Sequence, residues 1–389
     1  MSIEKTLFSI LRQVLSEDEE EVCALDGIDN EQLRRLLYLA QKHEIAHLVA
    51  YAYMNARRLG RDEDSKKIRK IVMSAFYQNE QKDYALSEIS GAFEELKIPY
   101  IPLKGLIVRE YYPEAWMRSS CDIDVLIKKE DMPKAIQNLL NLGYTLEQRE
   151  TPHDCSLTSP TGVHFELHHT LAQEGDFKKV NRFLKNAWDY TVDSVENPYR
   201  KNLTNEMFIL YHVAHMAKHL IRGGCGIRSF IDLWVVNRKM SFNSEIVENL
   251  LCEAGLLTFY HVILQVVKVW FEDEPHNDMT LALGQYVLKG GVYGTMSNFA
   301  AMDAVRVDSK IKWFFSLMFV SYKNLSIIYP KLVRYPILYP FYQVKRWFRI
   351  FSKDKRENIK KDTNMRNSVA KEKVNATKAL LKGLGLIEN

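Results

Sequence analysis

The sequence feature that most constrains the fold is a pair of aspartates inside a short apolar run. Asp122 and Asp124 flank one isoleucine, and the apolar residues continue to Ile127. Because side chains alternate along a strand with a period of two, both carboxylates point to the same face. Two carboxylates held on a rigid strand suit a Mg²⁺ ion that also holds the phosphates of a substrate. The pattern predicts a strand with a functional face and favours an enzyme of phosphoryl chemistry.

Two neighbouring motifs strengthen this interpretation. Lys104 and Gly105 precede the aspartates, and a glycine lets the backbone approach phosphate groups closely. Glu166 lies between apolar residues in a second strand-like segment and offers a third carboxylate. His164 and His168 share a strand face with Glu166, which makes them candidates to hold that carboxylate by hydrogen bonds.

The hydrophobic pattern divides the chain into helical and mixed regions. Helical periodicity before residue 97, strands alternating with helices up to residue 170, and renewed helical periodicity afterwards predict an α+β fold. The predicted regions are an N-terminal helical region at 1–96, an α+β core at 97–170, a C-terminal helical domain at 171–308, a basic aromatic segment at 309–353 and a polar tail at 354–389.

Several classes of protein are excluded or disfavoured by what the sequence lacks. The five cysteines are scattered without a CxxC pair, which fits a reducing cytoplasm. No signal peptide and no apolar run long enough for a spanning helix is present, so we expect a cytoplasmic protein. The motifs GxxxxGK[ST], GxGxxG after a strand and GxSxG are also absent. Their absence argues against P-loop NTPases, Rossmann dehydrogenases and α/β-hydrolases.

The segment 309–353 has an unusual composition. It contains nine lysines and arginines, many aromatic residues, and no aspartate or glutamate. One interpretation is peripheral contact with the inner face of a membrane, where basic and aromatic residues act together. The other is a helical subdomain whose aromatic residues form its core. A surface for single-stranded nucleic acid ranks third, so nucleic acid is not the expected partner.

Further charged and histidine residues lie on predicted helices. His212, His215 and His219 fall near one helical face, which is compatible with a zinc site. No cysteine or carboxylate accompanies them at ligand spacing, so packing within a helical region, or lining a cleft, is the favoured interpretation. Arg228 and Asp232 are four residues apart, which allows an ordinary ion pair along a helix, so a structural role is favoured.

Together these motifs resemble the polymerase-β-like nucleotidyltransferase superfamily, in which a glycine, Asp-x-Asp and an isolated acid follow one another. The similarity is closer to one branch, the bacterial "uncharacterised nucleotidyltransferase" family, and extends over about residues 33–240. The matching motifs are Ile98-Pro-Tyr-Ile-Pro-Leu-Lys-Gly105, Tyr112-Pro113, Arg118, Asp122-Ile-Asp124, Gly143-Tyr144 and Glu166-Leu167-His168. The chain has Lys-Gly-Leu where the wider superfamily has Gly-Gly or Gly-Ser.

The resemblance implies a small mixed-sheet core of the polymerase-β type, with helical regions on both sides. It also implies transfer of a nucleoside monophosphate from an NTP such as ATP to an acceptor hydroxyl of a small molecule, sugar or peptide. The implied catalytic and Mg²⁺-binding residues are Asp122, Asp124 and Glu166, and the implied nucleotide-binding residues are Lys104, Gly105 and Arg118. The alternative is a catalytically inactive protein of this fold that acts as a membrane-surface or partner-binding scaffold.

Overall fold

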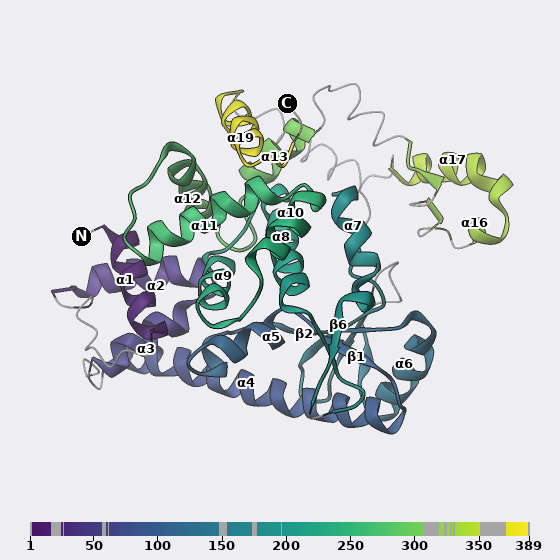
Figure 1. The fold of residues 1–389 in the computed structure, drawn as a ribbon, viewed down its shortest axis with the longest axis horizontal. Coiled ribbons are helices and arrows are strands. Elements are labelled where there is room, and N and C mark those ends of the chain that lie inside the picture. Colours follow the sequence, from purple (N-terminus) through teal and green to yellow (C-terminus); the bar gives the residue numbers. More distant parts are fainter. Residues whose placement is uncertain are drawn as a thin grey trace.

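The computed structural model describes residues 2–16, 25, 27–56, 60, 62–147, 154–172, 177–195, 197–306, 319–322, 325–326, 329, 331–350 and 371–387. Figure 1 shows a mostly helical molecule with one mixed sheet beside a helical body. The predicted α+β class is therefore confirmed. Within the described residues no helix is both long and apolar enough to cross a membrane.

Four N-terminal helices precede the sheet: α1 (Ile3–Leu15), α2 (Asn30–Lys42), α3 (Ala46–Asn55) and α4 (Glu63–Glu95). The long helix α4 runs along one side of the whole body (Figure 1). Its first half buries Ile68 and Val72 in the helical core, and its second half buries Ile89 and Phe93 under the sheet. One helix thus ties the two hydrophobic cores together.

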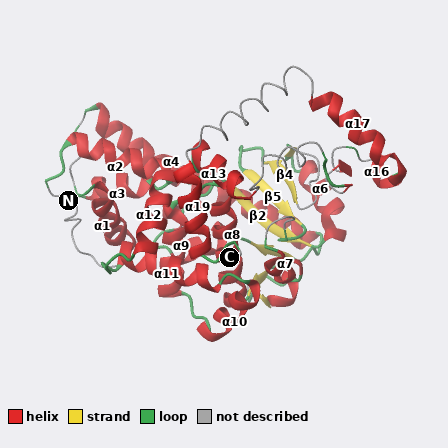
Figure 2. Cartoon of the chain, turned by 90° about the horizontal axis from the view of Figure 1, so that it is seen from above, coloured by secondary structure: helices red, strands yellow, loops and turns green. Residues whose placement is uncertain are grey.

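The main sheet has five strands in the order β1-β2-β5-β4-β3. Its central pair, β2 and β5, is parallel, and the other neighbouring strands are antiparallel. Figure 2 shows β2, β5 and β4 side by side. The strands are β1 (Tyr100–Pro102), β2 (Asp122–Ile127), β3 (Thr145–Leu146), β4 (Asp154–Thr158) and β5 (His164–His168).

The alternation of side chains gives the sheet two different faces. Ile123, Val125 and Ile127 pack with Phe93 of α4 and Leu139 of α6 (Met132–Asn141) in one apolar cluster. The intervening aspartates of β2 consequently project from the opposite face. This opposite face is the one that the C-terminal helices approach.

Among the described residues after 171, the elements are helices and one two-stranded sheet of β6 (Thr191–Asp193) and β7 (Lys201–Leu203). The core of this region merges with that of the N-terminal helices into one large apolar cluster. The helices are α7 (Lys178–Lys185), α8 (Asn205–Ile221), α9 (Ile227–Lys239), α10 (Ser244–Ala254), α11 (Leu257–Phe271), α12 (Asp278–Gly290), α13 (Met296–Arg306), α16 (Lys331–Arg334), α17 (Tyr339–Ile350) and α19 (Lys371–Gly383).

The short connections beside β2 consist of one α-helix and three 3-10 helices. They are α5 (Gly105–Val108), η2 (Arg109–Tyr111), η3 (Ala115–Met117) and η4 (Lys129–Asp131). Two further 3-10 helices lie at η5 (Ala187–Tyr190) and η6 (Pro336–Leu338). The predictions made for 309–318 and 354–370 lie outside the described residues.

Two buried histidines at the α2–α3 junction predict that acid destabilises the fold. His47 donates a hydrogen bond from Nε2 to the carbonyl of Met117 at 2.8 Å, and burial lowers its pKa to about 4. Burial likewise lowers the pKa of His43 to about 4. The unfolded chain protonates these histidines near pH 6.5, whereas the folded protein excludes the proton until pH falls to about 4. The contribution of the two neutral histidines to folding stability is therefore complete above pH 6.5, and it is lost as pH falls from 6.5 to about 4.

We expect each histidine to contribute about 1.4 kcal/mol per pH unit to the slope of unfolding free energy between pH 6 and 5. Urea denaturation of wild type and His47→Gln at several pH values measures this slope of the unfolding free energy against pH. Gln keeps an N–H donor for Met117 but does not titrate, so its slope should be smaller by about one proton. Identical slopes in the two proteins would contradict the assignment.

Candidate active site

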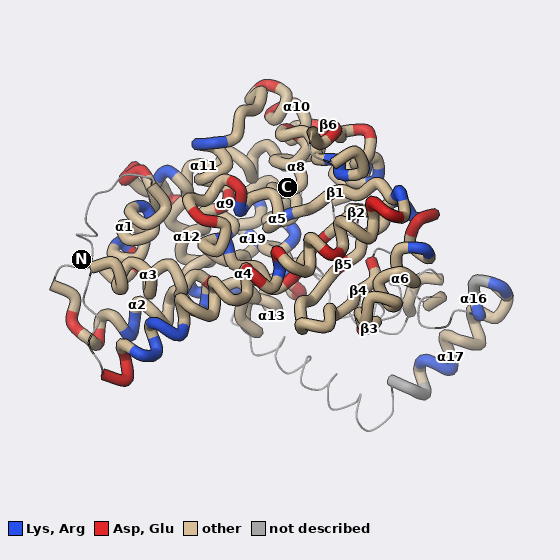
Figure 3. Tube along the Cα trace, turned by 90° about the horizontal axis from the view of Figure 1, so that it is seen from below, with Lys and Arg blue, Asp and Glu red and all other residues tan. Residues whose placement is uncertain are grey.

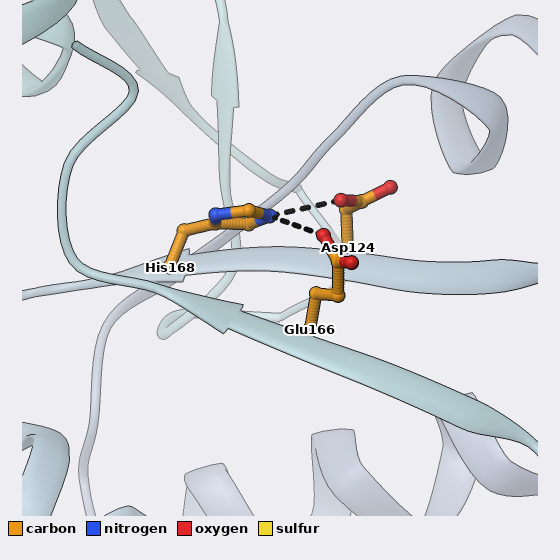
Figure 4. A group of neighbouring side chains, drawn as sticks. All are labelled: Asp124, Glu166 and His168. Carbon is orange, nitrogen blue, oxygen red and sulfur yellow. Dashed lines mark hydrogen bonds and ion pairs between the residues drawn. The ribbon is translucent and has the colours of Figure 1, made fainter. Parts of the chain in front are cut away.

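The parallel pairing of β2 and β5 places the predicted acids next to each other. Asp124 lies opposite Glu166 in the register, and Asp122 lies opposite His164. Figure 4 shows Asp124, Glu166 and His168 converging from the two strands. His168 Nε2 is 2.8 Å from Asp124 Oδ1 and 3.3 Å from Glu166 Oε2. The structure thus brings together carboxylates that are 42 residues apart in the chain.

Asp124 is the most enclosed of these acids and already has two cationic partners. Its side chain is 3% exposed, and Oδ1 accepts hydrogen bonds from Lys104 Nζ at 2.7 Å and from His168. Burial opposes ionisation, but Lys104 and His168 hold the pKa of Asp124 well below its ordinary value. Burial alone would lower the pKa of His168, yet its bonds to Asp124 and Glu166 raise it to about 9. At neutral pH His168 is therefore an imidazolium between two carboxylates.

Lys104 reaches Asp124 from a turn that a lysine rarely adopts. Its φ of 47° and ψ of −116° are close to those of the second residue of a type II′ turn, a position that glycine usually occupies. The amide of Leu106 closes this turn by donating to the carbonyl of Leu103 at 3.2 Å. A side chain in this conformation costs about 1–3 kcal/mol of strain. The ion pair with Asp124 offsets part of that cost.

Asp122 differs from Asp124 because it has no partner of opposite charge in contact. Its carboxylate makes no hydrogen bond and no ion pair with any residue that the structure describes. Burial, followed by repulsion from Asp124, raises the pKa of Asp122. A half-buried, unpaired carboxylate beside two others is a donor set of hard oxygens, which fits a divalent cation such as Mg²⁺.

The tightest group of possible metal ligands is slightly different from the predicted one. Among the described residues, one ligand atom each from Asp124, Glu166 and His168 lies within 4.8 Å of the others. Asp122 was predicted as a ligand, whereas this group holds His168 instead. A protonated His168 has no free ring nitrogen for a metal, and in this state it contacts both acids instead.

These residues line a cavity of about 380 Å³ between the sheet and the C-terminal helices. Helix α8 contributes a stripe of side chains to it at the spacing of successive turns, namely Phe208, Tyr211, His212, His215, Lys218 and His219. A smaller chamber of about 60 Å³ adjoins the main cavity and shares Lys104, His168, Tyr211, His215 and Lys218 with it.

Two polar groups of α8 face the cavity without a partner. The hydroxyl of Tyr211 and the ammonium of Lys218 make no hydrogen bond or ion pair within the part of the chain that is described. Tyr211 is only 7% exposed. Burial and the nearby Arg222 lower the pKa of Lys218 to about 8. Both residues line the cavity, so these two groups are placed to contact a bound ligand.

The three histidines of α8 do not form a metal site with each other. His212 donates from Nε2 to the carbonyl of Ser229 at 3.1 Å, and Nε2 of His219 lies 3.1 Å from Nε2 of His215. Burial lowers the pKa of His219 to about 4 and that of His215 well below its ordinary value. The two are therefore neutral, with one ring donating to the other. All three histidines line the cavity, which fits the prediction of packing or cleft lining.

The ion pair that helical spacing allowed between Arg228 and Asp232 does not form. Asp232, which is 1% exposed, instead binds the guanidinium of Arg118, with NH2 at 2.7 Å and Nε at 2.9 Å. Tyr112 donates its hydroxyl to the same carboxylate at 2.7 Å. Arg228 pairs with Glu44 at 2.6 Å. Helical spacing allowed the local pair, but each side chain finds a partner in a distant element.

Gly105 has a packing reason to be glycine. A Cβ at this position would lie 2.9 Å from NH1 of Arg118 and 3.4 Å from the Cβ of Ser120. NH1 also donates to the carbonyl of Ser119 at 2.9 Å, so the guanidinium is held on two sides. Gly105 therefore makes room for the buried ion pair at the edge of the cavity.

We expect Gly105→Ala to destabilise the protein by about 1–3 kcal/mol, as overpacking of a fixed neighbour does. The matched control is Gly91→Ala, because Gly91 lies inside α4 and a Cβ there meets nothing within 4 Å. That control should gain up to about 1 kcal/mol from helix propensity. Chemical denaturation compares the two variants. A Gly105→Ala protein as stable as wild type would show that Arg118 shifts freely.

Sequence reasoning missed some residues of the cavity. Tyr211 and Lys218 were detectable, since they continue the stripe that the histidines of α8 begin. Glu44 had no usable signal: it follows α2 with a positive φ of 57° and reaches the cavity from the N-terminal region. Its carboxylate also accepts a hydrogen bond from Tyr293 at 2.7 Å.

Comparisons with known proteins give one sequence match and one structural likeness to report. A protein family described as "uncharacterised nucleotidyltransferase" matches residues 29–272. No curated protein matches the chain. Among solved structures, the antibiotic-resistance factor ANT(2'')-Ia aligns with 50% of this chain and 100% of its own, at 12% sequence identity and a TM-score of 0.34.

Proposed function

The chain belongs to the uncharacterised nucleotidyltransferase family, as its motifs predicted, and on that premise we propose that it is a Mg²⁺-dependent nucleotidyltransferase. It transfers a nucleoside monophosphate from an NTP to an acceptor hydroxyl. The observation that carries the proposal is the register of β2 and β5, which places Asp124 beside Glu166 on the cavity face of the sheet.

The proposed metal-binding and catalytic residues are Asp122, Asp124 and Glu166. Asp122 offers an unpaired carboxylate, and Glu166 is 27% exposed at the cavity wall. When bound, Mg²⁺ would neutralise phosphate charge and polarise the phosphoryl group under attack. Glu166 would orient the acceptor hydroxyl, and the His168 imidazolium would hold Asp124 and Glu166 in place.

The proposed phosphate-binding residues lie around these acids. Lys104, in the turn after β1, and Lys218, on α8, both line the cavity, and the Lys104 ammonium also contacts Asp124. Gly105 keeps the backbone accessible beside Lys104. Arg118 borders the cavity, but Asp232 and Ser119 engage its guanidinium. Its role in the proposal is therefore to add positive potential and to hold the loop before β2, without a bidentate grip on phosphate.

Positioning and electrostatics would supply most of the rate, because phosphoryl transfer asks for little covalent chemistry from the protein. The acceptor would enter from the side of α8, where the Tyr211 hydroxyl is unpartnered. Small molecules, sugars and peptides all carry suitable hydroxyls, and ATP is the proposed donor to test first. The proposed setting is the cytoplasm, which supplies NTPs and Mg²⁺ and keeps thiols such as those of Cys155 and Cys225 reduced.

One observation supports a second candidate, a catalytically inactive member of the family that acts as a scaffold. Asp124 is already neutralised by Lys104 and His168, so part of the site is satisfied by the chain's own cations. A scaffold would retain this arrangement without binding a nucleotide. The two candidates therefore differ in a simple measurement.

Calorimetric titration of the full chain with ATP, GTP, CTP and UTP, each with and without Mg²⁺, distinguishes them. Nucleotidyl transfer requires that at least one nucleotide binds in a Mg²⁺-dependent manner, and the preferred one identifies the donor. Absence of binding for all four nucleotides would contradict the enzyme and favour the scaffold.

A further inference from the structure

The C-terminal module formed by α16, η6 and α17 stands apart from the rest of the molecule. In Figures 1, 2 and 3 these helices project beyond the helical body and the sheet. The module has a small core of its own, in which Leu325, Leu332 and Tyr342 are buried together. The hydroxyl of Tyr322 donates to the carbonyl of Leu332 at 2.7 Å, which closes this core.

Although it has a core, the module leaves several large apolar side chains exposed to water. Ile337 at the tip of η6 is 87% exposed, and Phe341 in the first turn of α17 is 63% exposed. Tyr335, Leu338 and Val344 are exposed beside them. These five residues lie within ten consecutive positions that end in α17, and they are named here the 335–344 surface. An apolar patch of this kind commonly marks an interaction site.

Positive charge surrounds this surface. Lys331 and Arg334 precede it on α16, and Lys345 follows it on α17. No aspartate or glutamate occurs anywhere between 309 and 353. Figure 3 accordingly shows basic positions and no acidic ones on α16 and α17. The side chains of Arg334 and Lys345 also lie over tyrosine rings, at 5.6 Å from Tyr335 and 5.8 Å from Tyr342.

We propose that the 335–344 surface docks onto an anionic membrane surface, with Ile337 and Phe341 inserted among the lipids and the basic residues at the headgroups. Charge complementarity favours an anionic partner, since each lysine or arginine near such a surface adds attraction. The exposed aliphatic side chains favour lipid over single-stranded nucleic acid. Nucleic-acid surfaces rely on aromatic rings that stack on bases, and isoleucine, leucine and valine cannot do so.

Interfacial binding also fits the arrangement of the module. Its exposed apolar side chains lie in η6 and in the first two turns of α17, beside tyrosines, and tyrosine favours the boundary between lipid and water. The module lies away from the 380 Å³ cavity, none of whose lining residues comes from it. Docking would hold the protein at the membrane while leaving the cavity accessible. This inference does not depend on the proposed catalytic activity.

The test is co-sedimentation of the full chain with vesicles of two parts phosphatidylcholine to one part phosphatidylglycerol, and with vesicles of phosphatidylcholine alone. We expect binding to the anionic vesicles that weakens in high salt, because salt screens the attraction. The double variant Ile337→Asp/Phe341→Asp should weaken this binding at least about tenfold, since it places charge where apolar groups insert. Lys331→Gln/Arg334→Gln should reduce the preference for anionic over neutral vesicles.

The matched control is Tyr38→Asp/Val195→Asp, which changes two equally exposed apolar residues elsewhere on the molecule. It should bind vesicles like wild type, and unchanged circular dichroism should show that every variant is folded. The proposal is overturned if wild type fails to sediment with anionic vesicles, or if the control loses as much binding as Ile337→Asp/Phe341→Asp. Binding to single-stranded RNA without vesicle binding, or a dimer that the double aspartate variant dissociates, would assign the surface to a different partner.

Discussion

Asp232→Asn is expected to destabilise the folded protein by about 3–5 kcal/mol, the usual result of removing one partner from a buried ion pair. Asn preserves the shape of the side chain but leaves the Arg118 guanidinium buried without a counter-charge. Arg118 lies 9% exposed and Asp232 1% exposed, so water does not replace the missing partner. Since a domain is stable by only about 5–15 kcal/mol, this single change approaches the limit of folding.

Urea denaturation of the variant beside wild type measures the loss. The matched control is Asp193→Asn, which breaks an ion pair with Lys201 at a position where the aspartate is 80% exposed. Exposed pairs contribute about 0–1 kcal/mol, so the control should be nearly as stable as wild type. Equal stability of the two variants would show that Asp232 is not essential to the fold.

A second change separates the structural role of Arg118 from a phosphate-binding role. Combining Asp232→Asn with Arg118→Met removes the stranded charge, so the double variant should be more stable than Asp232→Asn alone. A direct grip on phosphate predicts the opposite pattern, namely that Arg118→Met weakens nucleotide binding strongly and leaves stability unchanged. The observed hydrogen bonds of Arg118 favour the structural pattern.

The sheet and its acidic face could be predicted because they depend on local rules. The aspartates at 122 and 124 share a face by strand periodicity alone, and the alternating residues Ile123, Val125 and Ile127 require a covered opposite face. An isolated acid in a second apolar strand is meaningful only if the two strands are neighbours. The resemblance to a known family implied that Glu166 acts together with the two aspartates. In the structure, β2 and β5 are parallel neighbours, and Asp124 lies opposite Glu166.

The partners of these residues could not be predicted, because each comes from a remote part of the chain. Arg118 and Asp232 are 114 residues apart, and Arg228 lies 184 residues from Glu44. Arg228 and Asp232 have the spacing of a helical ion pair. Tertiary packing nevertheless places Asp232 against Arg118 and Arg228 against Glu44. The strained turn at Lys104 also has no local signal, since its benefit arises from an ion pair with Asp124.

The second large effect is expected at Asp122, where a substitution should weaken nucleotide binding without lowering the stability of the fold. If Asp122 is a ligand of Mg²⁺, Asp122→Asn should weaken Mg²⁺-dependent nucleotide binding about 100-fold, which corresponds to about 2.7 kcal/mol. Stability should stay the same or rise slightly. The carboxylate has no partner among the described residues, and burial together with Asp124 disfavours its ionised form. Removing the charge therefore relieves repulsion.

Asp124→Asn is a poorer test of the same site. It would strand the charges of Lys104 and His168, so a loss of nucleotide binding could not be separated from a loss of folding. Asp122→Asn avoids this ambiguity, and Asp193→Asn again serves as the exposed control that should bind like wild type. Calorimetry with the preferred nucleotide and Mg²⁺, combined with thermal denaturation, gives both readings from one preparation.

Full binding by Asp122→Asn would remove Asp122 from the metal site and leave Asp124 and Glu166 to hold the ion. A joint loss of binding and stability would instead show that the Asp122 carboxylate supports the fold. The combination of lost binding with retained or increased stability is the one that a ligand-binding role predicts. A carboxylate held without a partner beside two others destabilises the free protein, and it benefits the molecule only when a cation arrives.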